Sequence, residues 1–545
     1  MKHLLPVLLL ATAACGGAPE TAKTPGGGSG SGGTAAKPLA KGDVAFDVAP
    51  IEIKGQLLVP EALERPGMML SPPKKKTTIE KLRDTVVKTK DVETRQALAI
   101  GLATLLYEDS KTNKANADKD LQEARQTLRD AVAAATDKAD DLTLKFLGVY
   151  EFLLAGQTNA DADYAGAEKA YSALVAKAPT DKEIASSRAW WALALLKQYK
   201  NADALAVVKD QPISDKAPDL AYVAAWAKLR TGDEAGAWQA IVAAAKGWAA
   251  KELPNKNFVD RDVMLFAART NASFADAQPA LVGLYGKDKA KQYETIAKLG
   301  LQAYGFAGRW ADAVTAIDKA IEVAGSTVPA NDMPVLRFTE ADFIVRLDTP
   351  DVGAKVAKQA LDALPACGAK CSDKDKQDIA TNIYGMGRLY HLLYATANDI
   401  RFYQPAHDLY AATIPLITDP TNKAQAQKDA AVLEQTLKNT KVGTGTHDKQ
   451  AIGVLLQRHN LEVGACYELG LAANPKLAGT LKLELESDTT GAIKGASTEP
   501  KAGLADMSAV AGCVVEHAKT WKLPHRGMPG STRISMTYNL APAKK

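Results

Sequence analysis

The sequence has few aromatic residues and few histidines, and its charges nearly cancel. Only 6% of the 545 residues are aromatic, seven are histidine, and 67 basic residues face 63 acidic ones, for a net charge of +4. A nucleic-acid-binding protein needs a concentrated basic surface, which this balance does not provide. The chain also lacks a nucleophile elbow, a phosphate-binding glycine loop and an HExxH motif. We therefore expect neither an enzyme, nor a cofactor-binding protein, nor a nucleic-acid partner.

An apolar run at the amino end is too short to span a membrane as a helix. Leu4–Ala11 follows a basic residue and is followed by small residues up to Cys15. This order predicts a signal peptide over residues 1–14. It resembles the lipobox of bacterial lipoproteins, although Thr12 stands where Leu is usual. The resemblance implies cleavage before Cys15 and lipidation of Cys15, and Gly16 in the next place implies the outer membrane, with the protein facing the periplasm or the cell surface. A plain secretory signal is the alternative.

Two further segments precede the helices. Residues 15–42 are rich in Gly, Ser and Pro and carry too little apolar surface to fold, which predicts a flexible tether spanning roughly 30 Å. In residues 43–76, Val44, Phe46 and Val48 alternate with other residues. This pattern predicts short strands or an extended arm laid on the helical array.

Residues 77–440 carry apolar residues at helical spacing and a repeat of 35 residues. Three copies of the repeat are Tyr164, Ala167, Tyr171 and Leu174; Tyr199, Ala202, Ala206 and Lys209; and Glu234, Ala237, Ile241 and Ala244. A repeat of this length indicates stacked helical hairpins, each of which needs its neighbours to bury its apolar face. The pattern resembles tetratricopeptide repeats, and its clearest copy is Tyr304, Gly308, Trp310, Ala313, Ile317 and Ala320. We expect a mainly α protein with a tetratricopeptide-like solenoid that binds other proteins.

One part of the array is dense in aromatic residues. The group comprises Tyr384, Tyr390, Tyr394, Phe402, Tyr403 and Tyr410. It is a candidate binding face lining a concave pocket, and packing inside the helical core is the alternative.

Four cysteines remain beside Cys15, an even number in what we expect to be an oxidising compartment. Cys367 and Cys371 are close enough in sequence to close a small local loop, which leaves Cys466 to pair with Cys513. A zinc site would need two spaced cysteine pairs or histidines at ligand spacing, and His459, His517 and the other nearby histidines show no such spacing. We therefore expect no metal site.

After a polar linker at 441–449, residues 450–545 change from helical to alternating periodicity. A short helix leads to a strand with Leu481, Leu483 and Leu485 on one face, a second strand, a helix over 504–520 and a closing strand. The resulting small α+β domain resembles the TonB-like carboxyl-terminal domain of the AgmX/PglI family, known from myxobacterial gliding-motility proteins. The matching residues are Cys466, Tyr467, Glu468, Pro475, Gly479, Gly491, Cys513, Trp521, Lys522, Leu523 and Pro524. The resemblance implies a periplasmic interaction module that binds partners through an exposed edge strand; a structural cap on the array is the alternative.

These features together predict a non-enzymatic outer-membrane lipoprotein. Its array and module would hold envelope proteins together in a complex for motility, export or transport, while lipidated Cys15 contacts the membrane. The alternative is a surface lipoprotein that binds glycans or nutrients on its helical-repeat face. The oligomeric state does not follow from the sequence.

Overall fold

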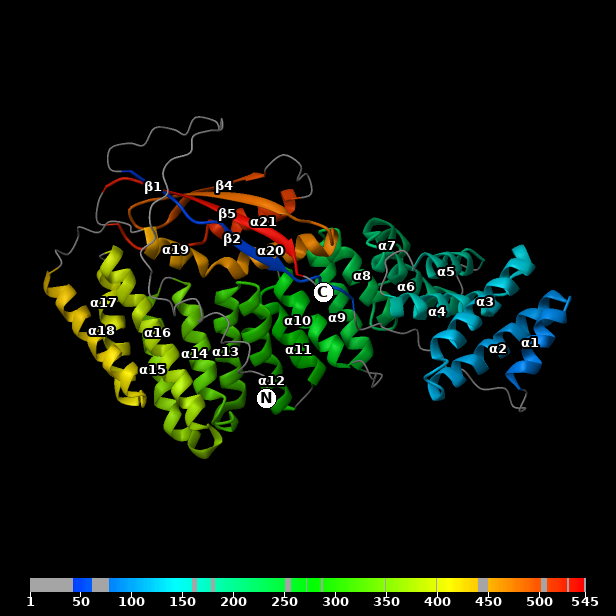
Figure 1. Ribbon diagram of the computed structural model, residues 1–545, viewed down its shortest axis with the longest axis horizontal. Coiled ribbons are helices and arrows are strands. Elements are labelled where there is room, and N and C mark those ends of the chain that lie inside the picture. Colours follow the sequence, from blue (N-terminus) through cyan, green and yellow to red (C-terminus); the bar gives the residue numbers. More distant parts are fainter. Residues whose placement is uncertain are drawn as a thin grey trace. The chain divides into compact units, whose positions relative to one another are not determined.

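The computed structural model describes most of the chain beyond the expected tether. The described residues are 43–60, 78–158, 164–177, 182–249, 256–270, 272–285, 288–347, 349–397, 399–439, 449–500, 507–526 and 529–543. The expected signal peptide, the tether and all but the last residue of the linker at 441–449 lie outside them. The described chain is mainly helical, with a small mixed sheet formed largely near its carboxyl end (Figure 1).

The chain divides into two compact units, at a boundary that the sequence patterns did not predict. The first unit is Leu57–Leu284 with Ala472–Pro475, and the second is Met1–Gln56, Tyr285–Leu471 and Lys476–Lys545. The expected array at 77–440 is thus split, and its second half belongs with the sheet.

The first unit is built of helices that pack on their neighbours in the chain. Their bounds are α1 Ile79–Lys88, α2 Val92–Thr112, α3 Ala117–Ala135, α4 Asp141–Thr158, α5 Ala165–Lys177, α6 Lys182–Lys197, α7 Asn201–Val208, α8 Pro218–Arg230, α9 Glu234–Ala249, α10 Lys256–Arg269 and α11 Phe274–Tyr285. Leu102 of α2 and Ala124 and Leu128 of α3 are buried in one apolar cluster. Alanine lets paired helices approach closely while leucine fills the remaining space.

The middle copy of the 35-residue repeat is out of register with the structure. Ala202 and Ala206 are exposed, whereas Ala204 and Val208 are the buried residues of α7. Tyr199, just before α7, has a φ of 57° and lies in the turn that sets where the helix begins. The buried face is therefore shifted by two residues, because the turn and not the repeat length fixes the phase of a helix. In the first and third copies, Ala167, Tyr171, Ala237 and Ile241 are buried as expected.

The second unit continues with helices α12 to α18. Their bounds are α12 Lys289–Lys298, α13 Trp310–Ala324, α14 Met333–Val345, α15 Pro350–Cys367, α16 Asp373–Ala397, α17 Tyr403–Thr413 and α18 Pro420–Asn439, with a π-helical turn at Leu299–Tyr304. The expected packing residues Tyr304, Trp310, Ala313, Ile317 and Ala320 are all buried.

The second unit also contains the whole sheet. Its strands are β1 Val44–Asp47, β2 Ile51–Gly55, β3 Gly479–Ser487, β4 Ile493–Pro500 and β5 Thr532–Pro542. The order is β1-β5-β3-β4, with β2 also pairing with β5. β3 is antiparallel to β4 and β5, whereas β1 and β2 run parallel to β5. Figure 1 shows the blue amino-terminal strands beside red β5.

The segment that we expected to lie on the array instead extends this sheet. Val44 pairs with Thr532 and Ile53 pairs with Leu540. We call residues 43–56 the arm. Pro50 separates its two strands, since proline lacks the N–H that a continuous ladder needs. Edge strands leave main-chain groups unpaired, and the arm pairs those of β5.

The arm is held to the module by side-chain hydrogen bonds as well as by backbone pairing. Asp43 accepts a hydrogen bond from the backbone N–H of Ser531 at 2.7 Å, and Glu52 accepts one from the Asn539 amide at 2.9 Å. Gly55 passes so close to helix α20 (Asn460–Ala473) that an added Cβ would lie 2.6 Å from a ring carbon of Tyr467. Ile53 is buried.

Three helices complete the carboxyl-terminal module. The expected single helix from residue 450 is two helices, α19 Lys449–Gln457 and α20 Asn460–Ala473, and α21 spans Ser508–Ala518 within the expected 504–520. The leucines of β3 pair across the sheet with β5, Leu483 with Met536 and Leu485 with Ile534, and all four are buried. Within the described residues, no helix combines the length and the apolar character needed to cross a bilayer.

Candidate functional site

The cysteines lie in the pairs expected from the sequence. Cys466 of α20 and Cys513 of α21 are at disulfide distance, with 5.7 Å between their Cα atoms. Cys367, the last residue of α15, and Cys371 are also at disulfide distance, with 5.6 Å between their Cα atoms. The predicted lipidation site Cys15 lies outside the described residues.

The aromatic group expected to form a binding face lies inside the packing of α16 and α17. Tyr384, Tyr390, Tyr394, Phe402 and Tyr410 are buried, and Tyr403 is half-buried. The Tyr384 hydroxyl donates to Asp429 at 2.6 Å. Burial raises the pKa of Tyr410 well above its ordinary value. Large aromatic side chains contribute most when fully removed from water, so this group serves as a core and not as an open face.

A buried carboxylate joins the module to the helices of the same unit. Glu462, in the first turn of α20, is only 2% exposed. Its Oε1 accepts a hydrogen bond from the indole N–H of Trp310 at 2.6 Å, and its Oε2 accepts one from Trp521. The first turn of a helix favours an acidic side chain electrostatically, and the indole donors replace the water that this carboxylate loses.

His459 completes this cluster. Its Nδ1 lies 2.9 Å from Oε1 of Glu462, and its ring stacks on Trp521 with 4.4 Å between ring centroids. Trp310 comes from α13, Glu462 from α20, and Trp521 from the segment after α21. We call His459, Glu462, Trp310 and Trp521 the junction cluster.

Gly308 allows the backbone before α13 to approach the junction cluster. Its φ of +74° lies in the left-handed region, and a Cβ added there would overlap the Cγ of Glu462. Glycine is thus required for two reasons: the backbone conformation and the space taken by Glu462. The glycine that matched the repeat consensus therefore also lies against the module.

A set of charges lies next to the cluster. Asp342 of α14 accepts hydrogen bonds from Arg346 at 2.9 Å and from Arg458 at 3.2 Å. Burial alone would raise the pKa of the Asp342 carboxyl, but the two guanidinium groups outweigh burial and lower it. Arg346 also donates to the Arg458 carbonyl and lies over the Trp310 ring, 4.4 Å from its centroid. Asp342 therefore remains ionised and holds the segment between α19 and α20 to α14.

A second link lies further along α16 and α17. Asp399, which is buried, accepts a hydrogen bond from the backbone N–H of His525 at 2.9 Å and pairs with Arg401 at 2.7 Å. Burial would raise the pKa of Asp399, yet these donors lower it. The segment after α21 is thereby held to the turn before α17.

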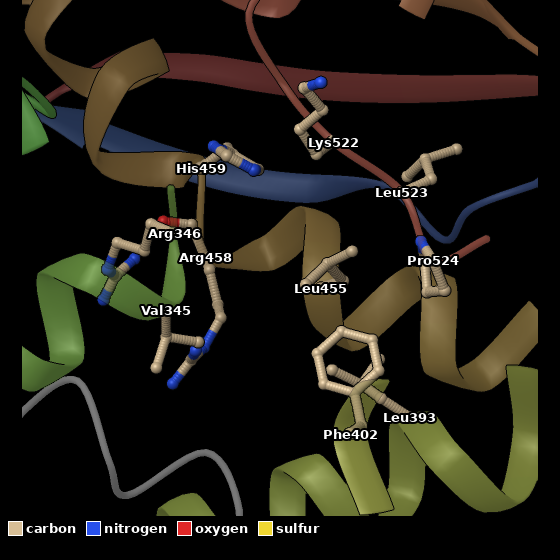
Figure 2. A pocket seen from close by; sticks show the side chains of 10 residues that line it. All are labelled: Val345, Arg346, Leu393, Phe402, Leu455, Arg458, His459, Lys522, Leu523 and Pro524. Carbon is tan, nitrogen blue, oxygen red and sulfur yellow. The ribbon is translucent and has the colours of Figure 1, made fainter. Parts of the chain in front are cut away.

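A small cavity of about 20 Å³ lies between these two links. Its lining residues are Val345, Arg346, Leu393, Phe402, Leu455, Arg458, His459, Lys522, Leu523 and Pro524. In Figure 2, Leu393, Phe402 and Leu455 lie on one side, and the side chains of Arg346 and Arg458 lie on the other. The lining combines cationic and aliphatic groups, and a cavity of this size admits a water molecule rather than a larger ligand.

The junction cluster escaped notice in the sequence because its members lie far apart in the chain. In the sequence, Trp310 matches the repeat consensus and Trp521 belongs to the module motif. No sequence pattern near either tryptophan indicates that it contacts Glu462. The only signal was a glutamate placed among apolar residues at the start of α20. His517 was also set aside, although the structure places it beside Cys466 and Cys513.

No protein-family model matches the chain, and no curated protein matches it either. The likeness to solved structures is distant, as two examples illustrate. A circular tandem repeat protein with a novel repeat topology is 11% identical, with a TM-score of 0.16 over 72% of this chain and 89% of the other. The structure of Naa15/Naa10 bound to HypK-THB is 13% identical, with a TM-score of 0.11 over 73% of this chain and 84% of the other. These scores are too low to carry an argument about fold or function.

Proposed function

We propose that this protein is a non-enzymatic outer-membrane lipoprotein that acts as a scaffold for an envelope complex in motility, export or transport. In this proposal the helical array is of the tetratricopeptide type and the module resembles the AgmX/PglI domain. The lipobox-like residues before Cys15 support the anchor. The burial of Tyr304, Trp310 and Ile317 at the consensus places supports the repeat assignment.

The observation that carries the proposal is the pairing of the arm with β5. The arm follows the expected tether directly, and it is a strand of the module's sheet. A lipid at Cys15 would therefore be attached to the module through residues 16–42. The junction cluster then connects the module to α13, and Asp342 connects it to α14. A protein built this way holds its second unit close to the membrane and leaves helices available for partners.

The same pairing changes where a partner strand can bind. The arm covers the edge of β5, so the outer strands are those of the arm at one side of the sheet and β4 at the other. We propose that a partner strand adds at β4, whose outer edge has no partner strand among the described residues. Strand addition supplies main-chain hydrogen bonds without requiring a deep pocket.

A photo-crosslinking residue at Ser497, which is exposed on β4, tests this proposal in cells. We expect crosslinks to envelope proteins, and a matched probe at Glu516, exposed on α21, should give fewer. Equal yields at both positions, or no envelope protein from either, would contradict the proposal. Separately, Cys15→Ser should move the protein from the membrane fraction to the soluble fraction, and unchanged membrane association would contradict the anchor.

The alternative of a glycan-binding lipoprotein loses the observation that suggested it. Its expected face was the aromatic group, of which only Tyr403 is more than marginally accessible. Substitution of Tyr403 by Ala should therefore leave any glycan retention unchanged.

A further inference from the structure

Three side chains that bind soft metal ions lie together between α20 and α21. Cys466, Cys513 and His517 each offer one ligand atom, and these atoms lie within 4.8 Å of one another. Cys513 and His517 are four residues apart on α21, so they point to the same side of that helix. Cys466 faces them from α20. Sequence spacing did not reveal this arrangement, because Cys466 lies 47 residues before Cys513.

The donor set and its spacing suit zinc. Thiolate sulfur binds Zn²⁺ at about 2.3 Å and imidazole nitrogen at about 2.0 Å, so ligand atoms around a tetrahedral ion lie roughly 3.5–4 Å apart. In the structure the two sulfur atoms are bonded to each other, so reduction must release them before side-chain rotation can bring them to this spacing. Three protein ligands leave the fourth position to water. Cys466 is buried, whereas Cys513 and His517 are partly exposed, which gives an ion a route from solvent.

The environment of His517 favours a bound cation. Oε2 of Glu462 lies 3.8 Å from Nδ1 of His517. A carboxylate beside a ligating histidine stabilises the metal-bound form and helps fix the ring. This separation is longer than a hydrogen bond, so the Glu462 carboxylate would act on a bound cation as a nearby negative charge.

Zinc and the disulfide exclude each other, because both use the same two sulfur atoms. A small dithiol opens the bond by exchange: it transfers two electrons and two protons, the protein gains two thiols, and the dithiol becomes a cyclic disulfide. Zn²⁺ then displaces the two thiol protons as it binds. We propose that the reduced form of this protein binds one Zn²⁺ through Cys466, Cys513 and His517. The ion then replaces the covalent link between α20 and α21.

The test uses the full chain with Cys367→Ser and Cys371→Ser, so that no other described cysteine pair can bind the ion. After reduction with a dithiol and removal of the reductant under nitrogen, Zn²⁺ affinity is measured by competition with a chromophoric chelator. We expect one ion per chain in the reduced protein and none in the oxidised protein. Co²⁺ in place of Zn²⁺ should give thiolate-to-metal charge-transfer absorption, and Mg²⁺ should not compete.

His517→Ala separates this site from adventitious thiol binding. It should weaken Zn²⁺ binding at least tenfold, a loss of the size seen when a metal site is disturbed. His525→Ala, an exposed histidine of the same module, should leave the affinity unchanged. Equal affinity in the His517→Ala protein would overturn the proposal. So would the absence of binding after reduction, or loss of the helical circular dichroism on reduction before any metal is added.

Discussion

The helices of the second unit pack on one another through apolar contacts, whereas the module is attached to them through buried polar groups. Along α13, Ala313, Ile317 and Ala320 are fully buried and need only shape to fit their neighbours. At the junction, by contrast, Glu462 has hydrogen-bond donors on both carboxylate oxygens. Apolar surfaces tolerate small shifts in register, but a buried carboxylate is satisfied in only one arrangement. The array can therefore vary in sequence, whereas the position of the module depends on a few residues.

The largest expected effect comes from removing the carboxylate itself. Glu462→Ala leaves the indole N–H groups of Trp310 and Trp521 without their acceptor and should cost about 3–5 kcal/mol of local stability. Hydrogen exchange of peptides from α13 and α20, followed by mass spectrometry, measures this loss. Glu516→Ala on exposed α21 is the control and should change little. A loss below about 1 kcal/mol in Glu462→Ala would mean that apolar contacts hold the module.

A second substitution tests the close approach at the junction. Gly308→Ala should cost about 2–4 kcal/mol, because it adds an overlap with Glu462 to the strain of a positive φ. Gly232→Ala is a matched control: its φ is +87°, but an added Cβ meets nothing within 4 Å. It should cost only about 1 kcal/mol. Equal losses in the two variants, measured by hydrogen exchange around each glycine, would show that Gly308 serves the turn alone.

Inside the helical packing, one polar group should make stability depend on pH. Burial raises the pKa of Glu340 on α14 to about 7, against an ordinary value of 4.5, even though Arg337 opposes the shift. The folded chain keeps a proton that the unfolded chain releases, so this contribution is complete below pH 4.5 and is lost as the pH rises to about 7. The size is on the order of 2–3 kcal/mol.

Melting temperatures between pH 5 and pH 7.5 measure the contribution of Glu340. Glu340→Gln should reduce the decline in melting temperature across this range. Glu322→Gln, whose carboxylate is exposed on α13, should leave the decline as it is. If the decline were equally steep in Glu340→Gln, another group would be responsible.

The smallest expected effect is in the apolar packing of α13. Ile317→Val removes one buried methylene and should cost about 1 kcal/mol. Glu462→Gln, which keeps the shape of the side chain at the junction, should cost more because it replaces one charged acceptor oxygen with a donor. Hydrogen exchange of α13 compares the two directly. A greater loss of stability in Ile317→Val than in Glu462→Gln would contradict the view that the polar junction is more sensitive to substitution than the apolar helix packing.

Local patterns predicted the local elements well. The helical spacing around Leu102 and Leu128 and the alternation from Leu481 to Leu485 each indicated the element that forms there. The repeat predicted the wrong buried residues in α7, because Tyr199, whose φ is positive, lies in the turn that sets where this helix begins. Periodicity reports which residues share a face, but it does not report how a turn rotates that face.

Long-range pairing could not be predicted in the same way. The alternation of Val44 and Phe46 indicates a strand but does not name β5, almost 490 residues away, as its partner. The junction cluster has the same character, since Trp310 and Glu462 are 152 residues apart. The expectation that the aromatic group from Tyr384 to Tyr410 forms an open binding face was wrong for a different reason. Composition shows that aromatic residues gather, but it does not show whether a neighbouring helix covers them.

The order of β1 and β2 along the arm gives its pairing with β5 a defined order of mechanical failure. The arm begins beside the amino end of β5, where Asp43 and Val44 are hydrogen-bonded to Ser531. A force applied at residue 43 and directed away from the sheet edge therefore loads those bonds first and those of β2 last, so the arm peels in chain order. Bonds that break one after another yield at a lower force than bonds sheared together. Under such a force we expect β1 to separate from β5 before β2 does.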